Sequence, residues 1–293
     1  MNQRRKWERR IGGILASFLE GVLGREHFAR LSRFLWRRAR LDYANDFEVN
    51  GERLVLESLA ERTRSEKLQV FDVGANVGEW SKLLVNLLQE RHANPDAVEL
   101  HLFEPAPAAA QELREWIDAS DVLGKTVVNE VAVANEPGKA ELSIKSPTAG
   151  TNSLQVEMPD DVQEKVDVKV TTIDKYCQKR GIQKIDFLKI DTEGNDFNVL
   201  LGAREMLENE TIGTTQFEYN WRWINFRHCL RDVFDLVKPT DYSLGKITPR
   251  GVEVYEKWDY ELENFFEGNF LIFGDITKVG LKRVGYWKDK KRR

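Results

Sequence analysis

The sequence predicts an α/β fold built on a mostly parallel sheet with helices on both faces. From residue 50 onward, short apolar runs alternate regularly with segments of helical, amphipathic spacing, an order typical of strand–helix–strand units. The runs are continuously apolar, as in strands that are buried on both faces. With 41% hydrophobic residues and eight tryptophans, the chain can fill the core that such a fold requires.

The first elements follow directly from these patterns. Residues 51–64 suit a helix, and 68–73 form an apolar strand that runs into an amphipathic helix over 78–91. A second apolar strand covers 97–105, and an alanine-rich helix follows over 107–119.

The alternation continues to the end of the chain. A third strand is predicted over 125–133, and 136–144 and 165–173 are expected to pair in antiparallel fashion around a polar loop. The remaining predicted elements are a helix over 174–181, a strand over 185–191, a helix over 195–208, a strand over 214–220, a helix over 229–238 and a last strand over 270–274. Residues 51–293 are therefore expected to form one domain.

Residues 1–50 are predicted to form a basic, amphipathic helical extension. Glu20 interrupts the apolar run and no small-residue cleavage site follows, which argues against a signal peptide. Length and charge exclude a membrane-spanning helix. Two interpretations stay open: the helices pack on the domain or on a second subunit of a homodimer, which is favoured, or residues 1–40 rest on an anionic membrane surface. The apolar residues at helical spacing are Ile11, Ile14, Leu15, Phe18, Leu19, Val22 and Leu23, then Phe28, Leu31, Phe34 and Leu35 beyond Gly24.

Charge and cysteine content narrow the partners and the compartment. The net charge is −4, but residues 1–40 carry about +8, which leaves about −12 on the remainder. The acidic remainder is therefore not a general nucleic-acid binder, and only the N-terminal extension could be one. Cys177 and Cys229 are too few for a disulfide framework or a zinc cluster. They predict reduced thiols in a cytoplasmic protein, located at the inner face of the membrane if the extension binds lipid.

The run VFDVGANVGEWSKLL, residues 70–84, predicts a nucleotide pocket because a buried-type strand passes through a glycine loop straight into a helix. Dinucleotide sites require G-x-G-x-x-G, but Asn76 stands at the second glycine position. Asp72 precedes the loop, where a carboxylate repels a pyrophosphate and attracts a cation. S-adenosylmethionine carries a sulfonium, an amino group and a ribose. It fits better, since Glu104 at the end of the next strand can bind the ribose.

Several motifs together resemble the FkbM family of S-adenosylmethionine-dependent methyltransferases. They occur in order between residues 68 and 275: VFDVGANVGEWSKLL, HLFEPAPAAAQEL, VVNEVAVANEPGKAEL, GTNSL, TTIDKYC and IDFLKIDTEGNDFNVLLGA. KIDTEG and LLGA are the most family-specific pieces. The resemblance implies a Rossmann-like, seven-stranded sheet whose last strand is antiparallel. It also implies O-methylation of a hydroxyl on a sugar, glycan or natural product. It does not extend to residues 1–50.

The predicted cofactor site gathers residues at the carboxyl ends of the strands. Glu104 would accept hydrogen bonds from both ribose hydroxyls. The residues expected along the methionine end are Asp72, Gly74, Ala75, Asn76 and Gly78. The remaining cofactor residues are Pro105, Asp191, Val131 and Ala132, of which the resemblance places the last two near the adenine.

Methyl transfer to a hydroxyl requires alignment, exclusion of water and removal of one proton. Asp191 and Glu193, at the end of strand 185–191, are the candidates for the catalytic base or the acceptor anchor. Lys189 alternates to the same sheet face as Asp191 and would orient that carboxylate or lower the pKa of the acceptor. A buried structural ion pair is the alternative for these three residues.

Residues near later strand ends supply weaker candidates. Asp191, Glu218 and Asn220 are oxygen donors of the kind that Mg²⁺ or Mn²⁺ prefers, although a metal-free pocket is favoured. Aromatic residues beside arginine suit a sugar, or equally a lid packed on the domain. The predicted substrate residues are Ser153, Glu218, Asn220, Trp221 and Trp223.

Three other classes of function are disfavoured. An N-methyltransferase acting on a macromolecule usually carries an Asn/Asp-Pro-Pro-aromatic motif, where this chain has Asp191-Thr192-Glu193-Gly194. Asn76 argues against a dehydrogenase. A non-catalytic S-adenosylmethionine-binding module, which keeps the fold but has lost the chemistry, is disfavoured because Asp72 and Glu104 occur together with the two acidic residues after strand 185–191.

Overall fold

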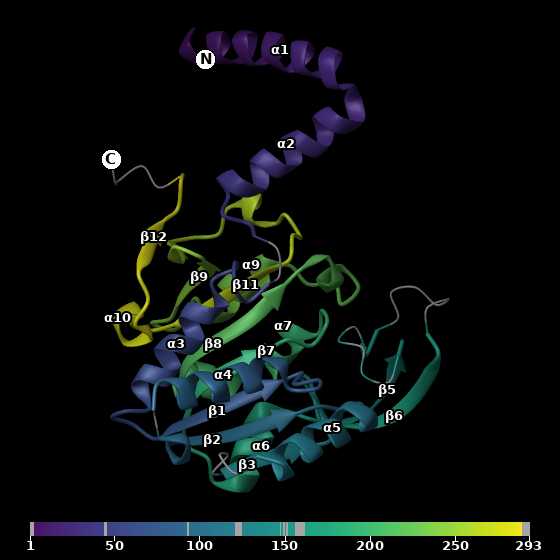
Figure 1. The fold of residues 1–293 in the computed structure, drawn as a ribbon, viewed down its shortest axis with the longest axis vertical. Coiled ribbons are helices and arrows are strands. Elements are labelled where there is room, and N and C mark those ends of the chain that lie inside the picture. Colours follow the sequence, from purple (N-terminus) through teal and green to yellow (C-terminus); the bar gives the residue numbers. More distant parts are fainter. Residues whose placement is uncertain are drawn as a thin grey trace. The chain divides into compact units, whose positions relative to one another are not determined.

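The computed structural model describes residues 3–43, 46–92, 94–120, 125–146, 148, 150, 152–155 and 162–288. The chain divides into two compact units, residues 1–43 and residues 44–293 (Figure 1). The first unit consists of two helices, and the second is a large α/β domain that contains every predicted site residue.

Two consecutive helices form the N-terminal unit: α1 (Gln3–Leu23) and α2 (Arg25–Ala39). Gly24 separates them with a φ of 76°, a left-handed conformation that favours glycine. The first helix therefore ends where the sequence predicts. Within the described ranges, no helix is both long enough and apolar enough to cross a membrane.

The domain is built on a single large sheet. Its strands are β1 (Leu68–Val73), β2 (Val98–Phe103), β3 (Lys125–Asn129), β7 (Ile185–Ile190), β8 (Ile212–Tyr219), β9 (Ser243–Thr248), β10 (Gly251–Tyr255), β11 (Gly268–Phe273) and β12 (Arg283–Gly285). They lie in the order β12-β10-β9-β11-β8-β7-β1-β2-β3. Neighbours from β8 to β3 are parallel, and β11 is antiparallel to both β8 and β9.

The predicted α/β sheet with an antiparallel late strand is confirmed, but the expected number of seven strands is wrong. The described chain has nine strands in this sheet, because β9 and β10 form a hairpin and β12 pairs with β10. Lys246 and Glu253 interrupt the apolar pattern of that hairpin. Their side chains are nevertheless buried, and they pair across the two strands at 3.9 Å. Only the tertiary pairing makes these segments recognisable as buried strands.

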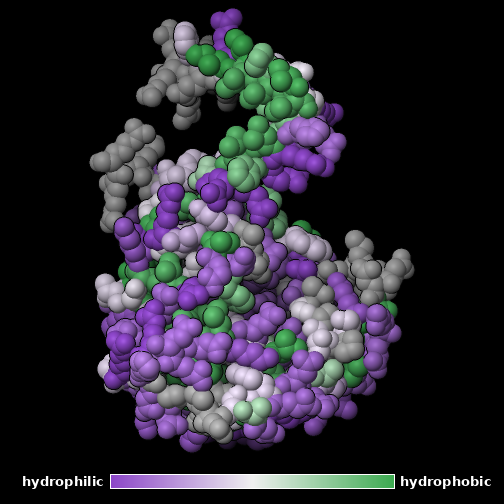
Figure 2. Space-filling view, viewed as in Figure 1, coloured by the Kyte–Doolittle hydropathy of each residue, from purple (hydrophilic) through white to green (hydrophobic). Residues whose placement is uncertain are grey.

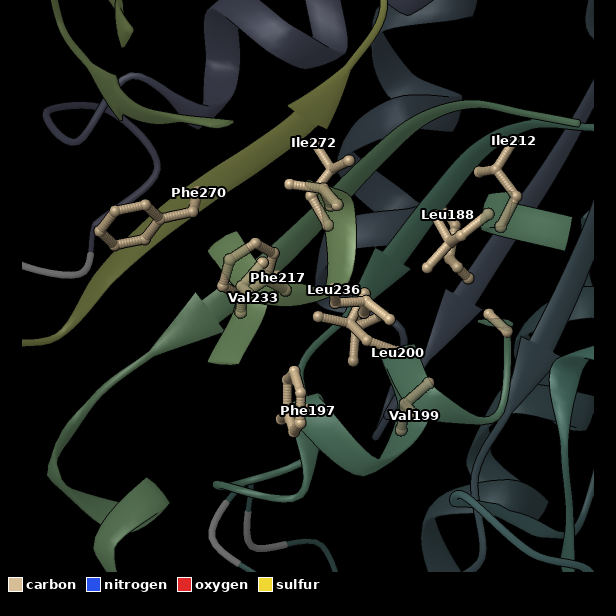
Figure 3. Packing of buried hydrophobic residues seen from close by; sticks show 14 of the residues in the cluster. Leu188, Phe197, Val199, Leu200, Ile212, Phe217, Val233, Leu236, Phe270 and Ile272 are labelled. Atoms are coloured by element: carbon tan, nitrogen blue, oxygen red, sulfur yellow. The ribbon is translucent and has the colours of Figure 1, made fainter. Parts of the chain in front are cut away.

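Helices cover both faces of the sheet. They are α3 (Glu52–Arg62), α4 (Glu79–Glu90), α5 (Pro107–Asp118), α6 (Ile173–Arg180), α7 (Asp196–Leu201), α8 (Arg204–Glu208), α9 (Leu230–Val237) and α10 (Ile276–Val279), with 3₁₀ helices η1 (Pro95–Ala97), η3 (Trp221–Ile224) and η4 (Tyr260–Leu262). One face packs on α3 and α4 and the other on α6 to α9. Figure 3 shows the second face, where Phe197 and Leu200 of α7 approach Phe217 of β8.

The helix predicted over 195–208 is two helices, because α7 and α8 break at Gly202. A Cβ on this glycine would lie 2.1 Å from the carbonyl oxygen of Ala134, so the backbone of the two segments must approach closely there. Gly202 therefore lies against Ala134, the residue that follows β4 (Ala132–Val133) of a second, smaller sheet.

The smaller sheet lies beside the carboxyl ends of the main strands. It consists of β4 (Ala132–Val133), β5 (Gly138–Ile144) and β6 (Glu164–Thr171), in the order β4-β6-β5. The antiparallel pairing of β5 with β6 agrees with the prediction, whereas the strand predicted over 125–133 divides into β3 and β4.

Candidate functional site

Two neighbouring cavities open at the carboxyl ends of β1, β2 and β7, where parallel α/β sheets bind ligands. The first cavity has a volume of about 530 Å³ and is lined in part by Glu104 and Val131. The second has a volume of about 510 Å³ and is lined in part by Asp72, Trp80 and Lys189. Both cavities share the residues Gly74, Asn76, Gly150, Asp191 and Glu193.

The glycine loop forms part of this shared wall. Gly74 has a φ of 81°, and a Cβ there would lie only 1.8 Å from the carbonyl oxygen of Asp191. The N–H groups of Gly74 and Ala75 both donate to the carbonyl oxygen of Phe103, which ties the loop to the end of β2. Glycine is therefore required for the loop after β1 to touch the loop after β7.

Gly78 has a different role from the one that the sequence predicts. It stands just before α4 with a φ of 85°, and its added Cβ would lie 2.8 Å from Cδ2 of Leu113 in α5. Neither cavity includes it among its lining residues. Gly78 thus allows close packing of α4 on α5 and does not contact the predicted site.

Glu104 follows β2 and connects the glycine loop with the start of α5. Its Oε2 accepts from the N–H of Asn76 and its Oε1 from the N–H of Ala106, both at 2.8 Å. The side chain is buried in the wall of the first cavity, and burial raises its pKa to about 7 against the opposing effect of the two backbone bonds. Each carboxylate oxygen keeps lone-pair capacity for a further donor.

The first cavity combines Glu104 with apolar walls. The predicted residues Pro105, Val131 and Ala132 all line it, together with Leu142 of the smaller sheet. A carboxylate at one side and aliphatic side chains at the other suit a ligand that carries hydroxyl groups on a flat, apolar ring system.

Asp72 and Trp80 each bring an unsatisfied polar atom to the second cavity. Oδ2 of Asp72 accepts from Oγ of Ser81 at 2.6 Å, but Oδ1 has no hydrogen-bond partner among the residues described. Nε1 of Trp80 is likewise unpartnered within the described chain. Because unpaired buried polar groups are costly, an acceptor and a donor left open in one cavity point to a polar ligand.

Lys189 and Asp191 form an ion pair between the two cavities. Nζ of Lys189 donates to Oδ2 of Asp191 at 3.1 Å, and the lysine side chain is 4% exposed whereas the aspartate side chain is 34% exposed. Burial lowers the pKa of Lys189, but the carboxylates of Asp191, Asp72 and Glu52 together raise it above its ordinary value. The pairing that the sequence predicts between Lys189 and Asp191 is therefore present, with the carboxylate as its accessible member.

Glu193 lines both cavities, but Arg222 holds its side chain. Oε2 of Glu193 lies 3.1 Å from Nε of Arg222, and the residue has a left-handed φ of 56°. Oγ of Ser153 donates to its carbonyl oxygen at 3.3 Å, which brings the predicted substrate residue Ser153 to the same wall. Glu193 therefore shapes the site while its charge is already compensated.

Two of the predicted metal ligands, Glu218 and Asn220, are engaged in hydrogen bonds within the protein. Nδ2 of Asn220 donates to Oε2 of Glu218 at 2.6 Å, and Oδ1 of Asn220 accepts from the N–H of Arg222. Both side chains are buried and neither lines one of the two cavities. No cluster of three His, Cys, Asp or Glu residues suited to a metal is found in the parts of the chain that the structure describes. The residues present thus do not fit the expected Mg²⁺ or Mn²⁺ site.

The two tryptophans after β8 separate into surface and core. Trp223 is fully buried, and its Nε1 donates to the carbonyl oxygen of Glu218, so its prediction as a substrate residue is wrong. Trp221 is 45% exposed, with the guanidinium of Arg222 5.1 Å from its ring centre. Both tryptophans belong to the 3₁₀ helix η3, in which residues two positions apart point in different directions. One ring therefore faces the core and the other faces the surface.

The sequence predictions miss several residues of the site, among them Trp80, Phe47 and Glu52. Trp80 and Phe47 line the second cavity, and Glu52 is buried below Lys189, where it accepts from Gln216 and Asn269. In the sequence, Trp80 is indistinguishable from a core position of an amphipathic helix, and Glu52 from an ordinary acidic helix start.

Comparison with known proteins identifies the class of this site. The methyltransferase FkbM domain family matches residues 72–248. The 2-O-methyltransferase NoeI of Sinorhizobium fredii is 24% identical over 200 residues, which cover 63% of this chain and 76% of that protein.

Solved structures of methyltransferases are also similar. Methyltransferase FkbM from Methylobacillus flagellatus has a TM-score of 0.42 and 15% identity, covering 71% of this chain but only 44% of that one. A candidate methyltransferase from Streptococcus mutans in complex with SAH has a TM-score of 0.41 and 10% identity, covering 76% and 96%. Because the family match extends over more than half of its length, the chain belongs to the FkbM methyltransferases.

Proposed function

We propose that this methyltransferase takes its methyl group from S-adenosylmethionine and transfers it to a hydroxyl oxygen of a sugar, glycan or natural product. The observation that carries the proposal is the pair of adjoining cavities, each with a buried carboxylate, that meet at Asp191. The oxygen acceptor is supported by the relative named a 2-O-methyltransferase and by the accessible carboxylate of Asp191.

The residues present fit this cofactor at both ends. In the first cavity, Glu104 would accept from the ribose hydroxyls, and Val131 and Leu142 would cover the adenine. In the second cavity, Oδ1 of Asp72 offers an acceptor for the ammonium of the methionine end, and Nε1 of Trp80 offers a donor for its carboxylate. An acceptor and a donor are the two kinds of group that the zwitterionic methionine end requires.

Bound S-adenosylmethionine supplies a methyl group that is already activated by the sulfonium, so the protein has to align an oxygen and remove one proton. Lys189 donates to Oδ2 of Asp191 and orients that carboxylate. The hydrogen bond from Lys189 engages Oδ2 of Asp191, so Oδ1 would accept the proton of the acceptor hydroxyl. The methyl carbon would then be bonded to the acceptor oxygen and no longer to the sulfur, which leaves S-adenosylhomocysteine. The proton then leaves to solvent from this side chain, which is one-third exposed.

The test uses the purified full chain and S-adenosylmethionine labelled in its methyl group. We expect label in a fraction of cell-envelope glycans or secondary metabolites, in a form that survives alkaline hydrolysis as an ether does. Mass spectrometry of the product locates the methyl group. Label found only on nitrogen would overturn the O-methyl assignment, and failure to bind the donor in calorimetry would overturn the cofactor assignment.

A further inference from the structure

Exposed apolar side chains concentrate on the two helices of the N-terminal unit. Figure 2 shows them as an almost continuous hydrophobic surface over α1 and α2. Surfaces that face only water rarely carry large contiguous apolar patches. The exposed large apolar residues of the unit are Trp7, Ile11, Ile14, Leu15, Phe18, Val22 and Leu23 on α1, and Phe34, Leu35 and Trp36 on α2.

Six of the seven exposed apolar residues of α1 occupy one side of the helix. At 100° per residue, positions 7, 11, 14, 15, 18 and 22 fall within a stripe of about 100°, whereas Gly13 and Ser17 fall well outside it. Trp7, Ile14, Phe18 and Val22 are each at least 66% exposed. A helix with one such apolar face is amphipathic and requires an apolar environment along that face.

The same unit is strongly basic. Residues 1–40 contain eleven Lys and Arg against three Glu, and Arg25, Arg30 and Arg33 of α2 are exposed. Two copies of this unit packed face to face would bring like charges together, which opposes association. An anionic surface instead compensates the charge and can receive the apolar stripe.

We propose that α1 and α2 bind the surface of an anionic phospholipid bilayer. The apolar stripe of α1 enters the boundary between headgroups and acyl chains, and the arginines contact lipid phosphates. No helix in the described part of the chain can cross a membrane. The proposed contact is therefore with one surface of the bilayer. The proposal is independent of the methyltransferase chemistry, because it uses no residue that lines either cavity.

The experiment measures co-sedimentation of the full chain with two kinds of vesicle, phosphatidylcholine with one-fifth phosphatidylglycerol and phosphatidylcholine alone. We expect binding about tenfold stronger to the anionic vesicles, weakened when salt screens the charges. The double variant Ile14→Asp/Phe18→Asp should lose about tenfold of that binding. The matched control Gly13→Asp/Ser17→Asp adds the same two charges at the same spacing outside the stripe. It should lose only the part of the binding that the two added charges oppose, and so should bind more strongly than the Ile14→Asp/Phe18→Asp variant.

Circular dichroism and methyl-transfer activity in solution should be unchanged in both double variants, which separates loss of binding from loss of folding. Equal binding of the wild type to both kinds of vesicle would overturn the proposal. The proposal would also be overturned if the Ile14→Asp/Phe18→Asp variant bound the anionic vesicles as strongly as the wild type does. A dimer in lipid-free buffer that this variant alone abolishes would identify a second copy of the chain as the occupant instead.

Discussion

At the scale of a single residue, Glu104 both connects two segments of the backbone and lines the first cavity. Its carboxylate accepts from the N–H groups of Asn76 and Ala106 and so connects the glycine loop to the start of α5. It also lines the first cavity, where in the proposed complex the ionised carboxylate would accept from the ribose hydroxyls. Burial raises the pKa of this carboxyl to about 7, which leaves it only partly ionised at neutral pH.

This raised pKa predicts that cofactor affinity depends on pH. Ionised Glu104 accepts from the ribose hydroxyls and protonated Glu104 does so poorly, so binding should weaken as pH falls through about 7. The ionised fraction drops about tenfold between pH 8 and pH 6, and the Kd of S-adenosylmethionine should rise by roughly that factor. Calorimetry at pH 8 and at pH 6 measures this change in Kd.

The amino group of the ligand also titrates, so the same measurement is made on the Glu104→Gln variant. The Kd of this variant should lack the part of the pH dependence that comes from Glu104. An equal pH dependence in both proteins would contradict the role of Glu104.

A second prediction tests Asp191 as the proposed proton acceptor. The Asp191→Asn variant keeps the shape of the side chain but cannot take up a proton, so turnover should fall by about 10²- to 10³-fold. The Kd of S-adenosylmethionine, measured by calorimetry, should stay within about twofold, since Asp72 and Glu104 hold the donor in the proposed site. The exposed control Asp235→Asn should leave both values unchanged. If Asp191→Asn retained full turnover, Lys189 and Asp191 would be a structural ion pair.

At the scale of elements, the site depends on how closely two loops approach each other. The loop after β1 and the loop after β7 touch because Gly74 has no side chain: an added Cβ would lie 1.8 Å from the carbonyl oxygen of Asp191. The positive φ of 81° adds a second reason for glycine. The same contact positions the shared wall between the cavities.

Gly74→Ala should therefore affect binding as well as stability. The variant has to push the two loops apart, and we expect it to lose at least about 2 kcal/mol of unfolding free energy. Measurable binding of S-adenosylmethionine should be lost with it. Gly138→Ala is the matched control, because no atom lies within 4 Å of its added Cβ. Chemical denaturation and calorimetry give the two readouts. If Gly74→Ala bound S-adenosylmethionine as tightly as the wild type does, the contact between the two loops would not shape the site.

At the scale of the whole molecule, the site brings together charges from distant parts of the chain. Asp72 of β1 lies directly opposite Lys189 of β7 in the sheet register, and Glu52 of α3 adds a third charge below them. Burial raises the pKa of Asp72 and of Glu52, while the lysine opposes the shift in both. A buried group of this kind is stable only when its members are present together.

Ligand binding should stabilise the entire domain through this site. With S-adenosylhomocysteine at about one hundred times its Kd, linkage adds about 2.7 kcal/mol to the free energy of unfolding. The midpoint of thermal unfolding should then rise by roughly 5–10 °C. NAD at the same concentration should leave the midpoint unchanged. Stabilisation by NAD without stabilisation by S-adenosylhomocysteine would favour a dehydrogenase over the methyltransferase proposed here.

Several features were predictable because they follow from local patterns. The apolar runs of β1, β2 and β7, the glycine loop and the position of Glu104 all depend on residues close in sequence. The strands β9 and β10 were not predictable, since Lys246 and Glu253 are buried only through their pairing across the hairpin. The burial of Trp223 was not predictable either, since it depends on packing against Phe197 and Phe217 from other elements.

The α/β class, the glycine loop and the carboxylates at the strand ends follow from the amino-acid order alone, because hydrophobic period and glycine position act over a few residues. Tertiary structure decided which of those carboxylates are accessible. Arg222 compensates Glu193, and Asn220 binds Glu218, whereas Asp191 stays open at the shared wall. Tertiary structure also brought Trp80 into the second cavity. Burial and pairing of charges depend on neighbours that folding brings from elsewhere in the chain.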